Sequence, residues 1–196
     1  RHLTVLFCDL VGSSALGQRL EAEAYRRIVQ AYHARATAAV ERYGGHVGQY
    51  LGDGLLVYFG HPQAHEDDAE RAVRAGREIL RELAVLSPRL EAEHGVRLAA
   101  RIGIHTGPVV IGDVGPLSRK EYTVIGDVVN TAARLMKASG DGILCDADTR
   151  RGCRGRVDFE QLAPIKLKGK SLQLEEIPED SDLEKKPSIK LKEVLD

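Results

Sequence analysis

Two long segments of this chain carry apolar residues at helical spacing, and a short segment with strand character lies between them. In residues 22–43 the apolar positions recur every three or four residues, and Gly44 and Gly45 follow directly. The same spacing runs from Ala69 to Leu83. Between them, residues 46–60 predict two short strands joined by a tight turn, a β-hairpin. This helix–hairpin–helix order favours folds in which helices cover a sheet.

Apolar runs on both sides extend this order. Residues 3–7 predict a buried strand, followed by a sharp turn and a serine helix cap at Ser13 or Ser14. Further along, strands are predicted at 98–104, 109–111, 143–145 and 159–165, and a shorter helix at 126–138. We therefore expect an α/β (α+β) fold: a ferredoxin-like βαββαβ core with C-terminal additions, in a mixed sheet covered by helices.

Length and composition limit the class of protein. The chain has 196 residues and a net charge of -1, which fits one large domain and lacks the basic stripe of a nucleic-acid-binding protein. No apolar run approaches the ~18 residues that a membrane span needs. We expect the folded domain to cover 1–177 and the polar, charged segment 178–196 to be a linker or tail.

Two further features concern the setting of the chain. The three cysteines lack metal-ligand spacing and fit reduced thiols in a cytoplasmic protein. The chain begins at Arg1 rather than at a methionine, so we expect it to be part of a longer protein with fused regulatory domains.

An aspartate stands at each of two positions where a strand is expected to end. Asp9 closes the first strand, and Asp53 lies at the hairpin tip between two glycines. If the hairpin pairs beside the first strand, the two carboxylates converge, and they repel each other unless cations lie between them. Mg²⁺ is held by one or two carboxylates plus substrate phosphates, so the pair suits a two-metal phosphoryl site. Taken singly, each aspartate also fits a purely structural role, as a cap or a turn residue.

Two other groups of residues suit a phosphorylated ligand. The turn after Asp9 can aim backbone N–H groups and a helix N-terminus at a polyphosphate; it consists of Val11, Gly12, Ser13 and Ser14. Asn130 and Arg134 are four residues apart on the predicted helix and share one face, which makes a donor pair for a phosphoryl group and a sugar oxygen. A solvated arginine and a surface amide are the plain alternatives for this pair.

Four segments, in this order along the chain, resemble the signature blocks of class III adenylate and guanylate cyclase catalytic domains. They are residues 7–14 (FCDLVGSS), 51–54 (LGDG), 101–107 (RIGIHTG) and 126–134 (GDVVNTAAR). The resemblance covers about residues 2–177, and residues 122–127 (YTVIGD) are similar to the soluble, bicarbonate-responsive adenylate cyclases. It implies an enzyme in which the 3′-hydroxyl of the nucleotide attacks its own α-phosphate and releases pyrophosphate.

The resemblance implies a role for each of five positions. Asp9 and Asp53 match the aspartates that bind two divalent metal ions, Mg²⁺ or Mn²⁺, and the Leu10 carbonyl is expected to join the coordination. Asn130 matches the residue that orients the ribose. Arg134 matches the arginine that stabilises charge on the α-phosphate in the transition state.

A homodimer with shared active sites is also implied by the resemblance. One protomer would supply Asp9 and Asp53 to each site. Its partner would supply Gln49, Thr123, Asn130, Arg134 and Lys168, the last resembling a lysine that grips the terminal phosphates. A monomer would then have no complete site.

The positions that read the base depart from the usual adenylate cyclase pattern. Typical adenylate cyclases have a lysine and an aspartate where this chain has Gln49 and Thr123; the threonine is familiar from the bicarbonate-responsive type. Guanylate cyclases typically carry glutamate and cysteine or serine there. We therefore expect ATP as substrate and cyclic AMP as product. A guanylate or dual-specificity cyclase and a catalytically silent nucleotide-binding module stay open as alternatives.

Overall fold

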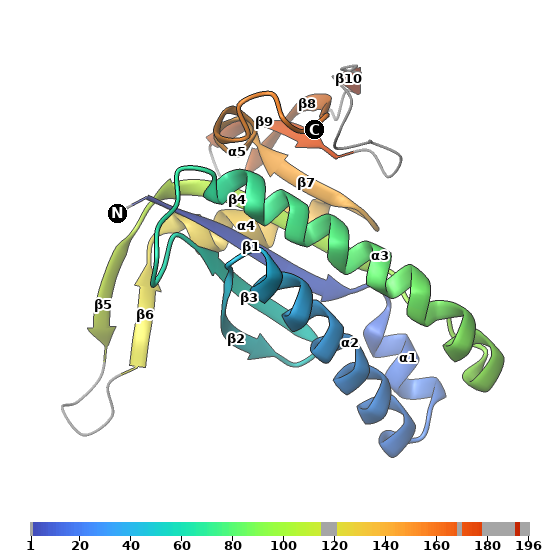
Figure 1. Ribbon diagram of the computed structural model, residues 1–196. Helices are drawn as coiled ribbons and strands as arrows, with labels where there is room; N and C mark the ends of the chain where they lie inside the picture. Colours follow the sequence, from blue (N-terminus) through green and yellow to red (C-terminus); the bar gives the residue numbers. More distant parts are fainter. Residues whose placement is uncertain (1, 115–120, 168–169, 178–190, 193–196) are drawn as a thin grey trace.

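The computed structural model describes residues 2–114, 121–167, 170–177 and 191–192 (Figure 1). The predicted core order is present. It consists of β1 (His2–Leu10), α2 (Ala22–Arg42), β2 (His46–Leu51), β3 (Gly54–Phe59), α3 (Asp68–His94) and β4 (Ala100–Pro108). The second half adds β5 (Val110–Val114), β6 (Glu121–Ile125), α4 (Asp127–Ala138), β7 (Ile143–Asp146), α5 (Ala147–Gly152), β8 (Glu160–Leu167) and β9 (Lys170–Glu176).

The main sheet has eight strands in the order β10-β8-β9-β7-β4-β1-β3-β2, where β10 (Leu191–Lys192) is a two-residue edge strand. β1 is antiparallel to both of its neighbours, β3 and β4, whereas β4 and β7 are parallel. β5 and β6 form a separate antiparallel pair. The sheet is therefore mixed and helix-covered, and the expected fold class is confirmed.

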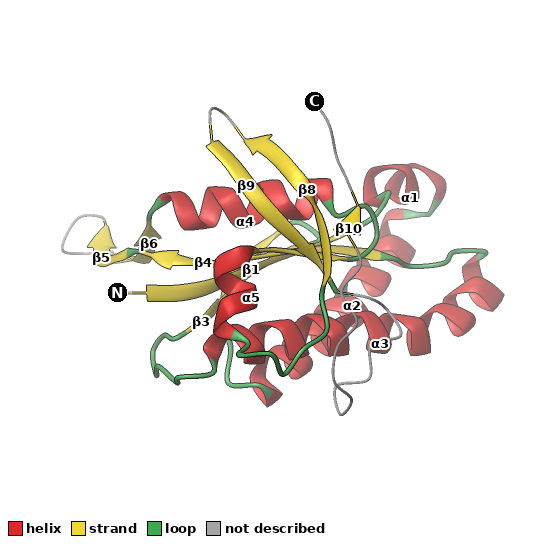
Figure 2. Cartoon of the chain, turned by 90° about the horizontal axis from the view of Figure 1, so that it is seen from above, coloured by secondary structure: helices red, strands yellow, loops and turns green. Residues whose placement is uncertain are grey.

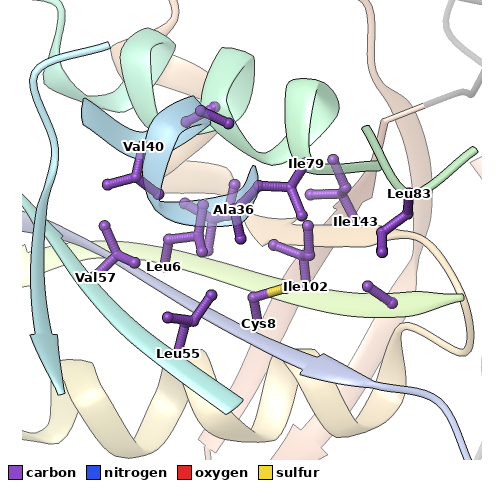
Figure 3. Packing of buried hydrophobic residues seen from close by; sticks show 14 of the residues in the cluster. Leu6, Cys8, Ala36, Val40, Leu55, Val57, Ile79, Leu83, Ile102 and Ile143 are labelled. Carbon is purple, nitrogen blue, oxygen red and sulfur yellow. The ribbon is translucent and has the colours of Figure 1, made fainter. Parts of the chain in front are cut away.

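Helices lie on both faces of the sheet (Figure 2): α2 and α3 cover one face, and α4 covers part of the other. The alternation of side chains along β1 explains how each face is filled. Leu6 and Cys8 point into the cluster with α2 and α3 (Figure 3). There the Cys8 Sγ lies 3.0 Å from the Tyr32 hydroxyl. Val5 points to the opposite face and packs with Val128 of α4.

The serine helix cap predicted after the first strand is wrong. The helix α1 (Ser13–Arg19) begins one residue after Gly12, which is the N-cap residue and makes no side-chain cap hydrogen bond. Gly12 has φ of 69°, a left-handed conformation that serine adopts with strain. The sharp turn itself is present, and glycine forms it.

Besides the two-residue strand β10, three elements were not predicted from the sequence, and one helix is longer than expected. β6, α5 and β9 are short, and their apolar patterns were too brief to stand out. α3 continues through Pro88 to His94 because Leu86 and Leu90, on either side of the proline, are buried in the core. The predicted tail 178–196 lies outside the described residues, apart from Leu191 and Lys192.

Candidate active site

The register between β1 and β3 brings the two predicted metal-binding aspartates together. Cys8 is paired with Leu55, so the next residue, Asp9, lies beside Gly54 and the hairpin turn. A Cβ atom built on Gly54 would stand 3.5 Å from the Asp9 Oδ1 and 3.3 Å from the Cys8 carbonyl oxygen. Asp53 immediately precedes this glycine. The convergence expected from the sequence is therefore present in the fold.

Asp9 interacts with the carboxylate of Asp53 and with the guanidinium of Arg101. The pKa of Asp9 is raised by burial and by the carboxylate of Asp53, and these effects outweigh a hydrogen bond from Arg101. That hydrogen bond joins the Arg101 Nη2 to the Asp9 Oδ2 over 2.7 Å. The Asp53 Oδ2 is buried and has no hydrogen-bond partner in the described chain. A buried carboxylate oxygen without a partner is costly, so this site is chemically incomplete as it stands.

A divalent cation fits this arrangement. It would neutralise both carboxylates and give the unpaired Asp53 oxygen a partner. Within the described residues no group of three or more His, Cys, Asp or Glu side chains lies close enough to hold a metal. Two carboxylates leave most of the coordination open, which suits Mg²⁺ that is also bound by substrate phosphates.

Two side chains of α2 also belong to this corner, and the sequence analysis did not identify them. The pKa of Tyr25 is raised by burial and by the charges of Asp53 and Asp9. Burial lowers the pKa of His33, and the nearby Asp53 opposes that shift in part. The His33 ring lies 5.0 Å from that of Tyr50. Tyr25 and His33 are eight residues apart, about two helical turns, so the spacing is visible in the sequence. No local pattern in the sequence, however, indicates that these two side chains lie near the hairpin tip.

The predicted phosphate-binding turn lies directly beside the aspartates. Leu10 is the last residue of β1 and its side chain is buried. Val11 and Gly12 are exposed and lead into α1, which begins with Ser13 and the exposed Ser14. The N-terminal end of α1 therefore lies next to the corner that holds the two aspartates.

The residues predicted to act from the partner protomer are not joined to the aspartates in this chain. Asn130 is exposed and Arg134 half-buried, both on α4. No hydrogen bond or ion pair connects either side chain to Asp9 or Asp53 in the part of the chain that the structure describes. α4 shares a sheet face with Val5 and Phe7, and strand alternation places Asp9 on that same face.

The remaining predicted site residues are spread over the fold. Gln49 is exposed on β2, at the edge of the sheet, and its neighbour Tyr50 donates or accepts a 2.9 Å hydrogen bond with Thr37 of α2. Thr123 lies on β6, in the separate hairpin. Lys168 lies outside the described residues.

Comparison with known proteins identifies the family to which this fold belongs. Residues 1–177 match the family model described as adenylate and guanylate cyclase catalytic domain. The chain belongs to this cyclase family. Among solved structures, the adenylyl cyclase CyaB from P. aeruginosa has a TM-score of 0.86 and 31% identity, and the match covers 90% of this chain and 93% of that one. The guanylyl cyclase Cya2 has a TM-score of 0.85 and 28% identity, and the match covers 90% of this chain and 91% of that one.

Curated relatives of this cyclase domain are longer proteins. Adenylate cyclase 1 of Rhizobium meliloti (strain 1021) is 28% identical over 178 residues, which are 89% of this chain and 27% of the relative. The adenylate cyclase of Anabaena cylindrica is 32% identical over 177 residues, which are 87% of this chain and 35% of the relative. The chain thus spans about a quarter to a third of these relatives. Among the described residues, no helix of the cyclase domain has the length and apolarity to cross a bilayer.

Proposed function

We propose that this cyclase domain converts ATP to 3′,5′-cyclic AMP and pyrophosphate with the help of two divalent metal ions. The observation that carries the proposal is the Asp9–Asp53 pair, with one buried carboxylate oxygen that lacks a partner. Two converging carboxylates repel each other unless cations lie between them, so the pair destabilises a purely structural domain. The pair therefore favours an active enzyme over a silent nucleotide-binding module.

Each residue of the proposed site has a task in this reaction. Asp9 and Asp53, with the Leu10 carbonyl, would hold the metals, which supply charge neutralisation and make the 3′-hydroxyl more acidic. The turn from Val11 to Ser14 would approach the polyphosphate with backbone N–H groups. On α4, Asn130 would fix the ribose so that the hydroxyl points at the α-phosphate.

Arg134 and Lys168 would act on the charge that moves during the reaction. The Arg134 guanidinium presents several N–H donors in a fixed plane, which suits the oxygens of the α-phosphate as negative charge builds up on them. Lys168 would bind the terminal phosphates, which leave as pyrophosphate. Cyclisation forms the 3′-oxygen–phosphorus bond and breaks the bond between the α-phosphate and its bridging oxygen.

The site is proposed to form between two copies of this chain. Asn130 and Arg134 make no bond to the aspartates within one chain, and they lie on the helix that shares a sheet face with Asp9. A second copy facing this side of the sheet would bring its α4 to the carboxylates. Two-fold symmetry then produces two equivalent sites per homodimer.

ATP is the proposed substrate because of the base-reading residues. Gln49 can present its NH₂ group to N1 of adenine, and the Thr123 hydroxyl can accept from the 6-amino group. The solved relatives named above comprise an adenylyl and a guanylyl cyclase at similar identity, so the proposal of ATP rests on these two side chains. We further infer that the chain is the catalytic part of a longer protein with fused regulatory domains, since it spans only about a quarter to a third of the curated relatives named above.

A direct assay tests this function. Purified protein is incubated with ATP or GTP, each with Mg²⁺ or Mn²⁺, and the cyclic product and pyrophosphate are quantified. We expect cyclic AMP with either metal and none after chelation. Cyclic GTP as the main product would assign the enzyme to the guanylate cyclases. Absence of any cyclic product from a dimeric, metal-saturated preparation would support the silent module instead.

A further inference from the structure

Arg101 lies directly across the sheet from Asp9. The register of β1 and β4 pairs the two residues, and the Arg101 Nη2 stands 2.7 Å from the Asp9 Oδ2. The three strands concerned, β3, β1 and β4, are neighbours in the sheet (Figure 1). Both side chains are largely withdrawn from solvent, with 33% of Arg101 and 20% of Asp9 exposed. At this depth the ion pair is only partly screened by water.

The ion pair is incomplete on both sides. Only one nitrogen of Arg101 bonds to Asp9, and the buried Nε has no hydrogen-bond partner within the described residues. A structural arginine–carboxylate pair usually uses two parallel N–H donors. On the acidic side, the Asp53 Oδ2 also lacks a partner. One guanidinium, held by a single hydrogen bond, therefore faces a corner that holds two carboxylates.

The two oxygens of Asp9 face different neighbours. Oδ2 accepts from Arg101, whereas Oδ1 lies on the side of Gly54, next to Asp53. A divalent cation drawn to the carboxylate pair and a guanidinium bound to one member of it carry charges of the same sign. They cannot both bind Asp9 at full strength.

We propose that Arg101 is the resident counter-ion of the metal-free site: it neutralises Asp9 while no metal is present and competes with the divalent cation for that carboxylate. Arg101 is thus a positioning residue that keeps the two aspartates together and lowers the affinity of the site for metal. This inference rests on the proposed role of Asp9 and Asp53 as metal ligands. It adds a residue to which no role has been given so far.

Mn²⁺ binding without nucleotide tests the inference independently of turnover. The free-Mn²⁺ signal in electron paramagnetic resonance is titrated for wild type, Arg101→Gln and Arg101→Lys. We expect Arg101→Gln to bind Mn²⁺ about three- to tenfold more tightly, the effect of removing one partly screened charge. Arg101→Lys keeps the charge and should stay within about twofold of wild type. The matched control is Arg35→Gln, which removes an ion pair of similar exposure with Glu82 and should change nothing.

Thermal melts give a second measurement. In EDTA, Arg101→Gln should melt below wild type because the carboxylates then repel each other without a counter-ion. Saturating Mn²⁺ should raise its melting temperature by more than it raises that of wild type, since tighter binding stabilises more. The same two melts show whether each variant is folded.

Three results would overturn the inference. They are unchanged or weaker Mn²⁺ binding by folded Arg101→Gln, equal tightening by Arg101→Lys, and tightening that persists when Asp9→Asn is added. If Arg101→Gln does not fold, the Arg101→Lys titration alone decides, because a tightening of tenfold with the charge retained excludes competition. A different result would contradict the proposed function. In that case wild type either binds no Mn²⁺ or binds it as tightly as Asp9→Asn does.

Discussion

Gly103 of β4 lies directly under Ala132 of α4, and a Cβ atom built on Gly103 would stand 2.1 Å from the Ala132 carbonyl oxygen. The same atom would be 2.2 Å from the Met136 backbone nitrogen. Both neighbours are backbone atoms of one helix, so no side chain can move to make room. The glycine therefore fixes how closely α4, with Asn130 and Arg134, approaches the sheet.

Replacing Gly103 by alanine should displace α4. We expect a loss of about 3 kcal/mol or more in the free energy of unfolding, the upper end for overpacking, because the clash is with backbone. Cyclase activity should fall further than stability alone explains, since Asn130 and Arg134 move with the helix. Urea unfolding and kcat measure the two effects. Gly17→Ala is the control: its Cβ would lie 3.8 Å from the Tyr25 ring, an ordinary contact, and should leave stability equal or higher.

Asp53→Asn should remove metal binding without harming the metal-free fold. The amide keeps the shape of the side chain and removes one of two repelling charges, so the melting temperature in EDTA should be unchanged or higher. The rise in melting temperature on adding Mn²⁺ should disappear, together with turnover. The control is Asp148→Asn, at an exposed position on α5, which should keep both the Mn²⁺-induced rise in melting temperature and the turnover. A normal Mn²⁺-induced rise in Asp53→Asn would remove Asp53 from the metal site.

Mixing two inactive variants should restore activity if sites are shared between protomers. Asp9→Ala and Arg134→Ala lie in different halves of the proposed site, so a mixed dimer has one site with both lesions and one with neither. With free subunit exchange about half the dimers are mixed, and activity should return to about a quarter of wild type. Asp9→Ala mixed with Asp53→Ala is the matched control. Both lesions fall in the same half, every mixed site carries one, and no activity should return.

Recovery must be judged against measured exchange. Subunit exchange is confirmed by mixing tagged and untagged protein and isolating the mixed dimer. If the mixed Asp9→Ala and Arg134→Ala dimer is isolated and inactive, each site is built within a single chain.

Gln49→Lys should sharpen the preference for ATP. The glutamine amide can flip and serve guanine as well as adenine, whereas an ammonium group only donates and faces the N1–H donor of guanine. One buried hydrogen bond left unmade is worth about 1–3 kcal/mol, or roughly ten- to a hundredfold in selectivity. We expect wild type to prefer ATP with detectable GTP turnover, and the variant to widen the ratio of kcat/KM. An unchanged ratio would show that Gln49 does not read the base.

Asp146 should make the stability of the C-terminal part of the sheet sensitive to acid. It caps α5 through hydrogen bonds from the Thr149 hydroxyl at 2.6 Å and backbone N–H at 3.2 Å, and its Oδ2 lies 3.0 Å from the His105 Nδ1. Burial raises the pKa of Asp146, but His105 and Thr149 outweigh it, so the net pKa is lowered. A lowered carboxyl pKa contributes stability above the unfolded-state value of about 3.9, and this contribution is lost as the pH falls through the folded-state pKa.

The measurement compares wild type with Asp146→Asn by urea unfolding at several pH values. Wild type should be more stable by on the order of 1 kcal/mol at pH 7, and the difference should hold to about pH 5. The difference should begin to shrink below about pH 4, and it should be lost once the pH falls below the lowered folded-state pKa, where the Asp146 side chain becomes neutral. If the difference in the free energy of unfolding grew as the pH fell, the ionised Asp146 side chain would not be the stabilising form.

The sequence by itself determined the order of the core elements and indicated which side chains to propose as reactive. Helical spacing in residues 22–43 and strand alternation in 46–60 are local properties, since each follows from burying one face of a single element. Asp9 and Asp53 could be chosen because each ends a predicted strand. The family resemblance of four short segments then linked them to nucleotide chemistry, and the family match confirms that family.

Only the tertiary structure decided which residues meet. Arg101 is 92 positions from Asp9 in sequence, and the register of β4 against β1 alone makes them partners. That register is set by apolar side chains buried on both faces of the sheet, and a slip by one residue would turn every side chain to the other face. The electrostatic influence of Asp53 on His33 likewise depends on the packing of α2 against the sheet. Long-range packing decides such contacts, and no local pattern in the sequence records it.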